Sequence, residues 1–207
     1  MLTTKFIPAT EPGQSRLMIV LHGLGDSLDG YEWFPEAMQI PWLNFLLVNA
    51  PDPYYGGYSW FDINSGHGIE RSRQLLFDLL DGLKDFPSEQ IVFSGFSQGC
   101  LMSVEVGARY PHHLAGIVGI SGYVHDAPRL IEELSPVARQ QRFLITHGTQ
   151  DPLIPIQEAR PQFALLKKAG LQIEWREFNK AHTIAGEVEM AVIRQFVRGC
   201  YVDSADV

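Results

Sequence analysis

The chain has 207 residues, of which 45% are hydrophobic and 19% charged, a composition typical of one globular domain rather than a disordered segment. Its formal net charge of −8 argues against a protein that binds nucleic acid through a basic face. Two cysteines are too few for a disulfide framework, no signal peptide pattern opens the chain and no apolar run could span a bilayer, so we expect a cytoplasmic protein without stable membrane insertion.

Short apolar runs alternate along the chain with longer segments of helical periodicity. Compact apolar runs such as RLMIVLHG predict buried strands, and the alternating pattern of LQIEWREF predicts a strand that is less buried. In chain order, we expect strands at 16–23 and 44–51, a helix at 69–86, a strand at 90–95, a helix at 97–109, strands at 114–122 and 142–148, a helix at 156–169, a strand at 171–178 and a helix at 186–199.

The apolar residues of these helices repeat at helical spacing, which predicts a buried stripe on each helix. Pro161 lies inside the helix at 156–169 and should make that helix start late or kink. The stripe of the helix at 69–86 consists of Leu75, Leu76, Leu79, Leu80 and Leu83. The last helix is expected to turn inward Val188, Val192, Ile193, Phe196 and Val197.

The order of these elements predicts an α/β fold. Strands that are apolar throughout and separated by helices favour a mostly parallel sheet flanked by helices on both faces. We expect residues 1–207 to form a single domain, without a lid domain, because only about twenty residues separate the strands at 114–122 and 142–148. Ligands of such sheets bind at the carboxyl ends of the strands, so the residues that follow each strand are the candidates for function.

Ser97 stands between two glycines in the segment GFSQG, where a predicted strand meets a predicted helix. The segment fits G-x-S-x-G, the nucleophile elbow of α/β-hydrolases, in which a strained turn lifts the serine hydroxyl above the sheet. Gly95 and Gly99 would let the strand and the helix approach closely, and the helix N-terminus would favour a developing oxyanion. The pattern indicates a nucleophile, although plain strand-to-helix turns use the same residue types.

Two other strand ends carry the groups that activate a serine. Serine is a poor nucleophile without a base, and His182 follows the predicted strand at 171–178. Asp151 follows the strand at 142–148 and could orient that histidine. Alone, His182 would be interpreted as a solvated loop residue and Asp151 as a turn residue before a proline. Together, the three residues follow the Ser…Asp…His chain order of this fold, which predicts a catalytic triad.

The segment HGLGD, residues 22–26, ends the first predicted buried strand. An oxyanion hole needs one backbone N–H from the residue after the nucleophile and one from the loop after an early strand. These donors are expected to be the amides of Gln98 and Leu24. One such donor supplies roughly 3 kcal/mol of transition-state stabilisation.

No metal or other cofactor is expected. The seven histidines form no pair with the spacing of metal ligands. The segment GLGDSL lacks the third glycine of a dinucleotide fingerprint, since Leu28 occupies that position. His22 and His147 each end a strand in the pair HG, and we interpret both as structural groups beneath the site.

Several motifs run in order from residue 21 to residue 182: LHGLGD, NAP, WFD, FSGFSQG and HGTQDPLIP, followed by a late histidine. Together they resemble the phospholipase/carboxylesterase family, which includes the acyl-protein thioesterases. The resemblance implies an α/β-hydrolase that cleaves carboxylic esters or acyl thioesters, in a cytosolic protein that can pair into homodimers. It also implies that Ser97, Asp151 and His182 form the triad and that Leu24 and Gln98 donate to the oxyanion.

Two segments depart from the family pattern. Ala181 stands where the family commonly has glycine before the histidine. The loop at 51–59, PDPYYGGYS, differs from the usual approach to WFD and is expected to border the acyl groove, which leaves the acyl preference open.

The site should be shallow and open, and therefore accessible to bulky acyl carriers. Leu153 and Ile154 directly follow the acid and are the favoured contacts for an acyl chain. Ordinary packing is the alternative for every apolar candidate, and for Trp60 it is the better interpretation. The candidate substrate-binding residues are Leu28, Trp33, Tyr54, Tyr55, Trp60, Leu153 and Ile154.

These patterns predict a serine hydrolase that acts through an acyl-enzyme on a small-molecule ester or an acylated substrate. Within this class, the sequence leaves open whether acyl-protein thioesterase or lysophospholipase activity dominates. A non-catalytic binding module on a hydrolase fold is the alternative from another class. It would predict a broken triad or a blocked oxyanion loop, and the sequence has neither.

Overall fold

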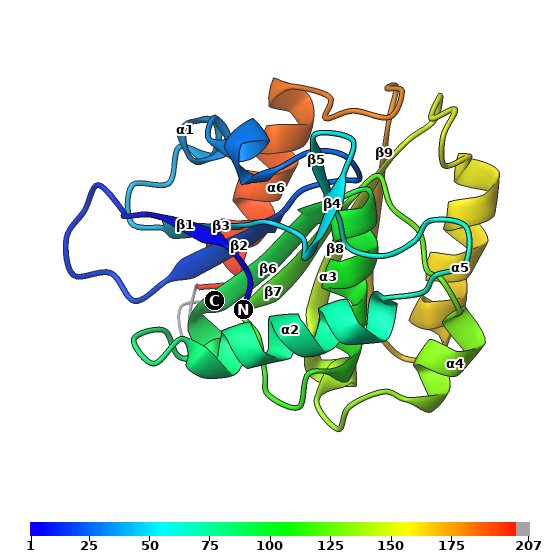
Figure 1. The fold of residues 1–207 in the computed structure, drawn as a ribbon, viewed down its shortest axis with the longest axis horizontal. Coiled ribbons are helices and arrows are strands. Elements are labelled where there is room, and N and C mark those ends of the chain that lie inside the picture. The colour runs from blue at the N-terminus through cyan, green and yellow to red at the C-terminus, as the bar shows by residue number, and fades with distance from the viewer. Residues whose placement is uncertain (202–207) are drawn as a thin grey trace.

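A seven-stranded sheet forms the centre of the computed structural model, which describes residues 1–201 (Figure 1). The strand order is β1-β3-β2-β6-β7-β8-β9, with β6 in the middle. Six strands run parallel, and β1 pairs antiparallel with β3. The strands are β1 (Thr4–Ile7), β2 (Leu17–Leu21), β3 (Asn44–Val48), β6 (Ile91–Phe96), β7 (Gly116–Ile120), β8 (Arg142–Gly148) and β9 (Gln172–Phe178).

Helices cover both faces of this sheet, as Figure 1 shows. One hydrophobic cluster joins the sheet to α1 (Phe34–Met38) and α6 (Glu187–Gly199). A second cluster lies on the opposite face. It joins the sheet to α2 (Ile69–Gly82), α3 (Gln98–Arg109), α4 (Ala127–Glu132) and α5 (Ile156–Lys168).

The burial of the strands explains their sequences. Every residue of β2, β3 and β7 is buried, as expected for parallel strands that are covered on both faces. Strand β9, at the edge of the sheet, alternates between buried and exposed positions over part of its length. The mostly parallel sheet with helices on both faces is therefore confirmed. The segment between β7 and β8 holds α4 and a 3₁₀ turn, Ala138–Gln140, rather than a lid domain.

Five short elements were not predicted: β1, α1, α4 and the two strands of a hairpin, β4 (Asp52–Tyr54) and β5 (Gly57–Ser59). Each has three to six residues, too few for an apolar period to stand out. Two further 3₁₀ turns, Leu28–Tyr31 and Ser88–Gln90, were also missed.

Three details of the predicted helices differ from the structure. Val188 is 65% exposed, because the first turn of α6 turns Glu189 and Met190 inward, and Met190 takes the place in the core. Helix α5 starts at Ile156, so Pro161 does not delay its start. Helix α2 ends at Gly82, four residues earlier than predicted.

The carboxyl ends of the parallel strands lie at one edge of the sheet, where the loops after β2, β6, β8 and β9 meet. These loops carry the candidate residues identified in the sequence. None of the helices within residues 1–201 has the length and apolar character needed to cross a membrane.

Candidate active site

Ser97 occupies the turn between β6 and α3 in a strained backbone conformation, with φ 55° and ψ −114°. Such a conformation costs a non-glycine residue about 1–3 kcal/mol and persists only where the surroundings impose it. Here the Ser97 amide donates to the carbonyl of Ile120 at 2.9 Å, which ties the turn to β7. A Cβ on Gly95 would collide with the backbone of Gly99, so the two glycines allow strand and helix to touch.

His182 bridges Ser97 and Asp151. Its Nε2 lies 2.9 Å from Ser97 Oγ, and its Nδ1 lies 2.7 Å from Asp151 Oδ2. A carboxylate can only accept, so Nδ1 carries the proton and Nε2 is free to accept the serine hydroxyl. The three residues come from loops after β6, β8 and β9, and they form one continuous chain of hydrogen bonds.

Asp151 is buried and its carboxylate is fully hydrogen-bonded. Its Oδ1 accepts from the amides of Leu153 at 3.0 Å and Ile154 at 2.9 Å. Burial acts to raise the pKa of the Asp151 carboxyl, but the Ile154 amide and the His182 imidazole outweigh burial and lower the pKa below its usual value. Asp151 is therefore held as the anion.

A buried ion pair fastens the loop that carries His182. Lys180 Nζ lies 2.6 and 2.8 Å from the two carboxylate oxygens of Glu189 on α6, and both side chains are almost fully buried. Glu189 also accepts from the amide of Ala185 at 2.6 Å. Burial lowers the pKa of Lys180, and Glu189 opposes that shift. The sequence contained no pattern that would predict this pair, since its members lie on either side of an irregular loop.

The histidines at the ends of β2 and β8 support the neighbouring loops. His22 Nδ1 donates to the carbonyl of Gly23 at 2.6 Å, and its Nε2 accepts from the amide of Ala50 at 3.0 Å. His147 Nε2 donates to the carbonyl of Ile154 at 2.9 Å. Burial lowers the pKa of both imidazoles. These contacts agree with the structural role expected for both residues.

Gln98 and Leu24, the candidate oxyanion donors, line the same groove as Ser97. Gln98 is the first residue of α3, where backbone N–H groups have no intrahelical acceptor. Its side chain points away from the groove, because Nε2 donates to the carbonyl of Phe61 at 2.9 Å and Oε1 accepts from the amide of Trp60 at 3.0 Å. The backbone of Gln98 is thereby anchored beside the serine.

The β4–β5 hairpin supports the loop that contains Leu24. The Gly25 amide donates to the carbonyl of Tyr58 at 2.9 Å, and the Tyr58 amide donates to the carbonyl of Asp26 at 2.9 Å. A Cβ on Gly57 would collide with the carbonyl of Gly25, so the two segments lie in direct backbone contact. Contrary to expectation, the loop at 51–59 does not line the groove that contains Ser97.

The groove around Ser97 has a volume of about 570 Å³ and largely apolar walls. It brings together Leu24, Ser97, Gln98, Leu153, Ile154 and His182 from among the predicted residues, with Asp151 behind the histidine. Leu153 is 71% exposed at its rim. Residues of the groove that the sequence analysis missed are Gly23, Asp26, Ile63, Phe96, Tyr123, Glu158 and Gln162.

Five predicted substrate contacts do not line the groove, and one of them, Trp33, lies in a separate hollow beside His182. Trp60 is 0% exposed and donates from its indole to the carbonyl of His22 at 2.9 Å. Leu28 is buried in the core cluster against α1 and α6. Tyr55 is 95% exposed at the hairpin tip, and the ring of Tyr54 packs beside Gly25. Packing or the hairpin turn holds each of these side chains away from the groove around Ser97.

The missed residues differ in how well a sequence could reveal them. Phe96 directly precedes the serine, so its position in the motif was a usable signal. The centroid of its ring lies 4.9 Å from that of His182. Ile63 and Tyr123 come from irregular loops that carry no motif. Within residues 1–201, no three His, Cys, Asp or Glu side chains gather in a way that could hold a metal ion.

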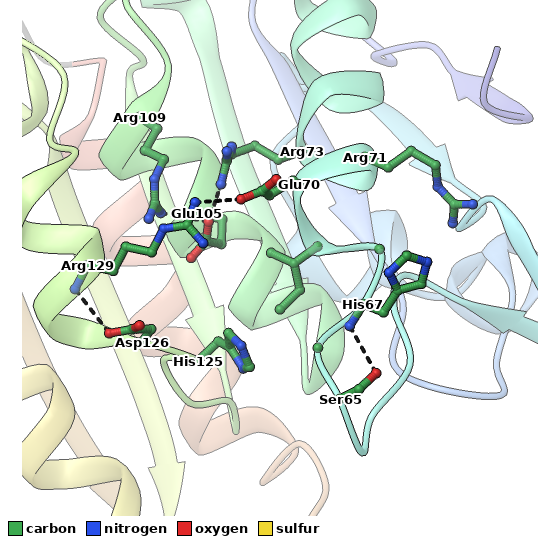
Figure 2. A pocket seen from close by; sticks show the side chains of 13 residues that line it. Ser65, His67, Glu70, Arg71, Arg73, Glu105, Arg109, His125, Asp126 and Arg129 are labelled. Carbon is green, nitrogen blue, oxygen red and sulfur yellow. Dashed lines mark hydrogen bonds and ion pairs between the residues drawn. The ribbon is translucent and has the colours of Figure 1, made fainter.

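A separate charged hollow of about 530 Å³ lies over α2, α3 and α4, as Figure 2 shows. Glu105 is buried and accepts from Arg73 at 2.8 Å and from Arg109 at 2.6 Å. Arg129 pairs with Glu70 at 2.6 Å and with a carboxylate of its own helix end, Glu133, at 2.9 Å. Because these opposite charges pair with one another, the hollow is best explained as an ionic network that joins three helices.

Known proteins resemble this chain over most of its length. A family model described as Phospholipase/Carboxylesterase matches residues 2–201. The chain is 34% identical over 201 residues to acyl-protein thioesterase 1 of Schizosaccharomyces pombe, a match that covers 86% of this chain and 88% of that protein.

Solved structures show the same fold. A crystal structure of the esterase PE8 has a TM-score of 0.83 and 25% identity, and the match covers 96% of this chain and 99% of that one. The crystal structure of acyl-protein thioesterase 2 of Zea mays has a TM-score of 0.80 and 21% identity, and covers 96% and 98% of the two chains. The predicted α/β-hydrolase fold is therefore confirmed.

Proposed function

Because the chain belongs to the phospholipase/carboxylesterase family, a family of serine hydrolases, we propose that it cleaves carboxylic esters and acyl thioesters at Ser97. The observation that carries the assignment to these residues is the unbroken chain of hydrogen bonds from Ser97 through His182 to Asp151, with distances of 2.9 and 2.7 Å. This chain lies at an apolar groove that can receive an acyl group.

The first half of the reaction transfers the acyl group to Ser97. His182 Nε2 takes the hydroxyl proton as Ser97 Oγ attacks the carbonyl carbon, and Asp151 stabilises the imidazolium that forms. The amides of Leu24 and Gln98 hold the oxyanion of the tetrahedral intermediate. As the bond to the leaving alcohol or thiol breaks, His182 gives that atom its proton.

The second half releases the acid. Water enters, His182 takes one of its protons, and the hydroxide oxygen attacks the acyl-enzyme carbonyl. The bond to Ser97 Oγ breaks, and His182 returns the proton to the serine. Each step uses groups that are present in this chain.

The apolar walls of the groove support acyl chains rather than charged acids as substrates. Leu24, Ile63, Phe96, Tyr123 and Ile154 line it, and its rim is open at Leu153. The open rim and the similarity to an acyl-protein thioesterase support thioesters on proteins as a second class of substrate beside small esters. A short acyl peptide with a cysteine thioester tests this directly against the free ester.

We further propose that the enzyme works in the cytoplasm. Cys100 and Cys200 are free thiols in the structure, and burial raises the pKa of the Cys100 thiol to about 12. Unpaired, unreactive thiols suit a reducing compartment. Cell fractionation with an antibody against the chain tests the proposal, and recovery only in an extracellular fraction would refute it.

The test of the function is hydrolysis of p-nitrophenyl esters from acetate to palmitate by the wild type and by Ser97→Ala. We expect kcat to fall by at least about 10⁴-fold in the variant, because the triad acts as a unit. The matched control is Ser103→Ala, which removes the hydroxyl of a buried serine farther along α3. Turnover that survives in Ser97→Ala would refute Ser97 as nucleophile. A folded wild type inactive on every ester and thioester would instead favour the binding module.

A further inference from the structure

A second, smaller groove of about 350 Å³ begins at His182 and leads away from the first. The two grooves share Asp26, Phe96 and His182. The larger groove continues towards α5, whereas the smaller one continues past Trp33, which directly precedes α1, and past Met190 on α6. His182 therefore stands between two separate hollows.

The proposed reaction assigns a different part of the substrate to each hollow. The larger groove contains Ser97 and the two candidate oxyanion donors, and its walls are mostly apolar, which suits the acyl chain. The leaving atom must receive its proton from His182 Nε2, so the leaving group lies on the side of the histidine. The smaller groove opens on that side.

Asp26 gives the smaller groove a fixed negative charge. Its Oδ1 accepts from the amide of Ser27 at 2.7 Å, and a Cβ on Gly30 would collide with this carboxylate. Within residues 1–201, Asp26 forms no ion pair with a basic side chain. The segment from residue 26 to residue 36 holds four acidic residues and no lysine or arginine.

Trp33 gives the same groove an aromatic surface. Its indole is 45% exposed, and its Nε1 donates to the carbonyl of Gly30 at 2.9 Å. The ring stacks on Tyr31 with centroids 6.4 Å apart and meets Phe34 edge-on at 5.5 Å. A tryptophan held in place beside an unpaired carboxylate is the combination that binds alkylammonium groups, through charge and through the face of the ring.

We propose that the smaller groove is the leaving-group subsite and that it favours substrates whose leaving group carries an alkylammonium charge. The proposal rests on the proposed function, since it assigns the second half of the same substrate. Asp26 and Trp33 are its specificity-determining residues, and neither takes part in proton transfer.

The test compares two thioesters with the same acyl group, butyrylthiocholine and its uncharged isostere S-(3,3-dimethylbutyl) thiobutyrate. We expect the wild type to prefer the cationic substrate in kcat/KM by about fivefold, the size of one exposed cation–π contact combined with one exposed ion pair. Asp26→Asn should lower the ratio in part, and the double variant Asp26→Asn/Trp33→Leu should bring it close to one. Trp33→Leu, which keeps an apolar side chain, should lower the ratio in part.

Glu158→Gln is the matched control. It removes the same charge from the larger groove, where Glu158 lies on α5, and it should keep the wild-type preference. Replacing butyryl by hexanoyl in both substrates should also keep the ratio, because the ratio belongs to the leaving group. If Glu158→Gln lost the preference for the cationic substrate to the same extent as Asp26→Asn, the net charge of the protein would explain the preference. That result would overturn the proposal.

The leaving-group subsite and the hydrolase function can be refuted separately. A wild type that hydrolyses both thioesters with equal kcat/KM overturns the leaving-group subsite and leaves the hydrolase function intact. A wild type that hydrolyses neither, nor any p-nitrophenyl ester, overturns the function and the subsite together.

Discussion

Asp151 shows how individual contacts set the state of the site. Two amides and one imidazole surround its carboxylate, and together they overcome the tendency of burial to keep it protonated. An ionised Asp151 fixes the tautomer of His182, which in turn leaves Nε2 able to accept from Ser97. The protonation of one buried acid thus decides whether the serine has a base.

This shift makes a prediction about pH. A carboxyl whose folded pKa lies below its unfolded value of 3.8 stabilises the fold above that value and loses this contribution as the pH falls through the folded pKa. Asp151→Asn should therefore be less stable than the wild type at pH 7, by a margin that shrinks below pH 3.8. Urea unfolding of both proteins at pH 7 and pH 3 measures the margin. A margin that stays constant would contradict an ionised, stabilising Asp151.

At residue scale, the sequence was informative where chemistry requires a motif. Ser97, Asp151 and His182 could be predicted because each follows a strand and because their order matches one known fold. Trp33 was predicted to contact substrate, and it lines the smaller groove. Lys180 and Glu189 could not be predicted, since a buried ion pair depends on which side chains the loop turns inward.

At the scale of elements, two loops are held by neighbours that the sequence did not reveal. The β4–β5 hairpin braces the loop that carries Leu24, and the Lys180–Glu189 pair braces the loop that carries His182. The long strands and helices were predictable from their periodicity. The hairpin was not, because three-residue strands show no period and the turn at Tyr55–Gly56 lies outside the sheet.

The hairpin contact can be tested with neighbouring glycines. Gly57→Ala places a Cβ against the Gly25 carbonyl, so the hairpin or the Leu24 loop must shift. We expect a loss of about 1–3 kcal/mol in stability from overpacking, and a fall in kcat of up to about 10²-fold if the oxyanion amide moves.

Gly56→Ala is the control for this variant. Gly56 has φ +92° and no atom within 4 Å of the added Cβ, so the change strains the turn without touching the loop. Its kcat should stay near that of the wild type. Equal kcat values for the two variants would show that the hairpin does not position Leu24.

The ion pair makes a second prediction at this scale. Lys180→Met leaves the Glu189 carboxylate buried without its partner, which should cost about 3–5 kcal/mol of stability. The double variant Lys180→Met/Glu189→Met removes both charges and should recover most of the loss. Chemical denaturation of the three proteins measures this, and kcat reports whether the His182 loop keeps its place. A double variant as unstable as the single one would contradict the account.

At the scale of the whole molecule, the parallel sheet explains why distant residues meet. Loops after four strands lie at its carboxyl edge (Figure 1). Ser97 and His182, which are 85 positions apart, can therefore form a hydrogen bond. This convergence was predictable from the order of the elements. The grooves were not, because their walls combine loop residues such as Ile63 and Tyr123 whose positions depend on the packing of the entire chain.

The most direct test of the account is labelling with a p-nitrophenyl alkylphosphonate. This reagent transfers its phosphonyl group to an activated serine, and the adduct mimics the tetrahedral intermediate. We expect stoichiometric release of p-nitrophenol and one phosphonyl group on the peptide that contains Ser97, with no labelling of Ser97→Ala. A label on another residue, or undiminished labelling of Ser97→Ala, would contradict the claim that the strained turn between β6 and α3 exists to present a nucleophile.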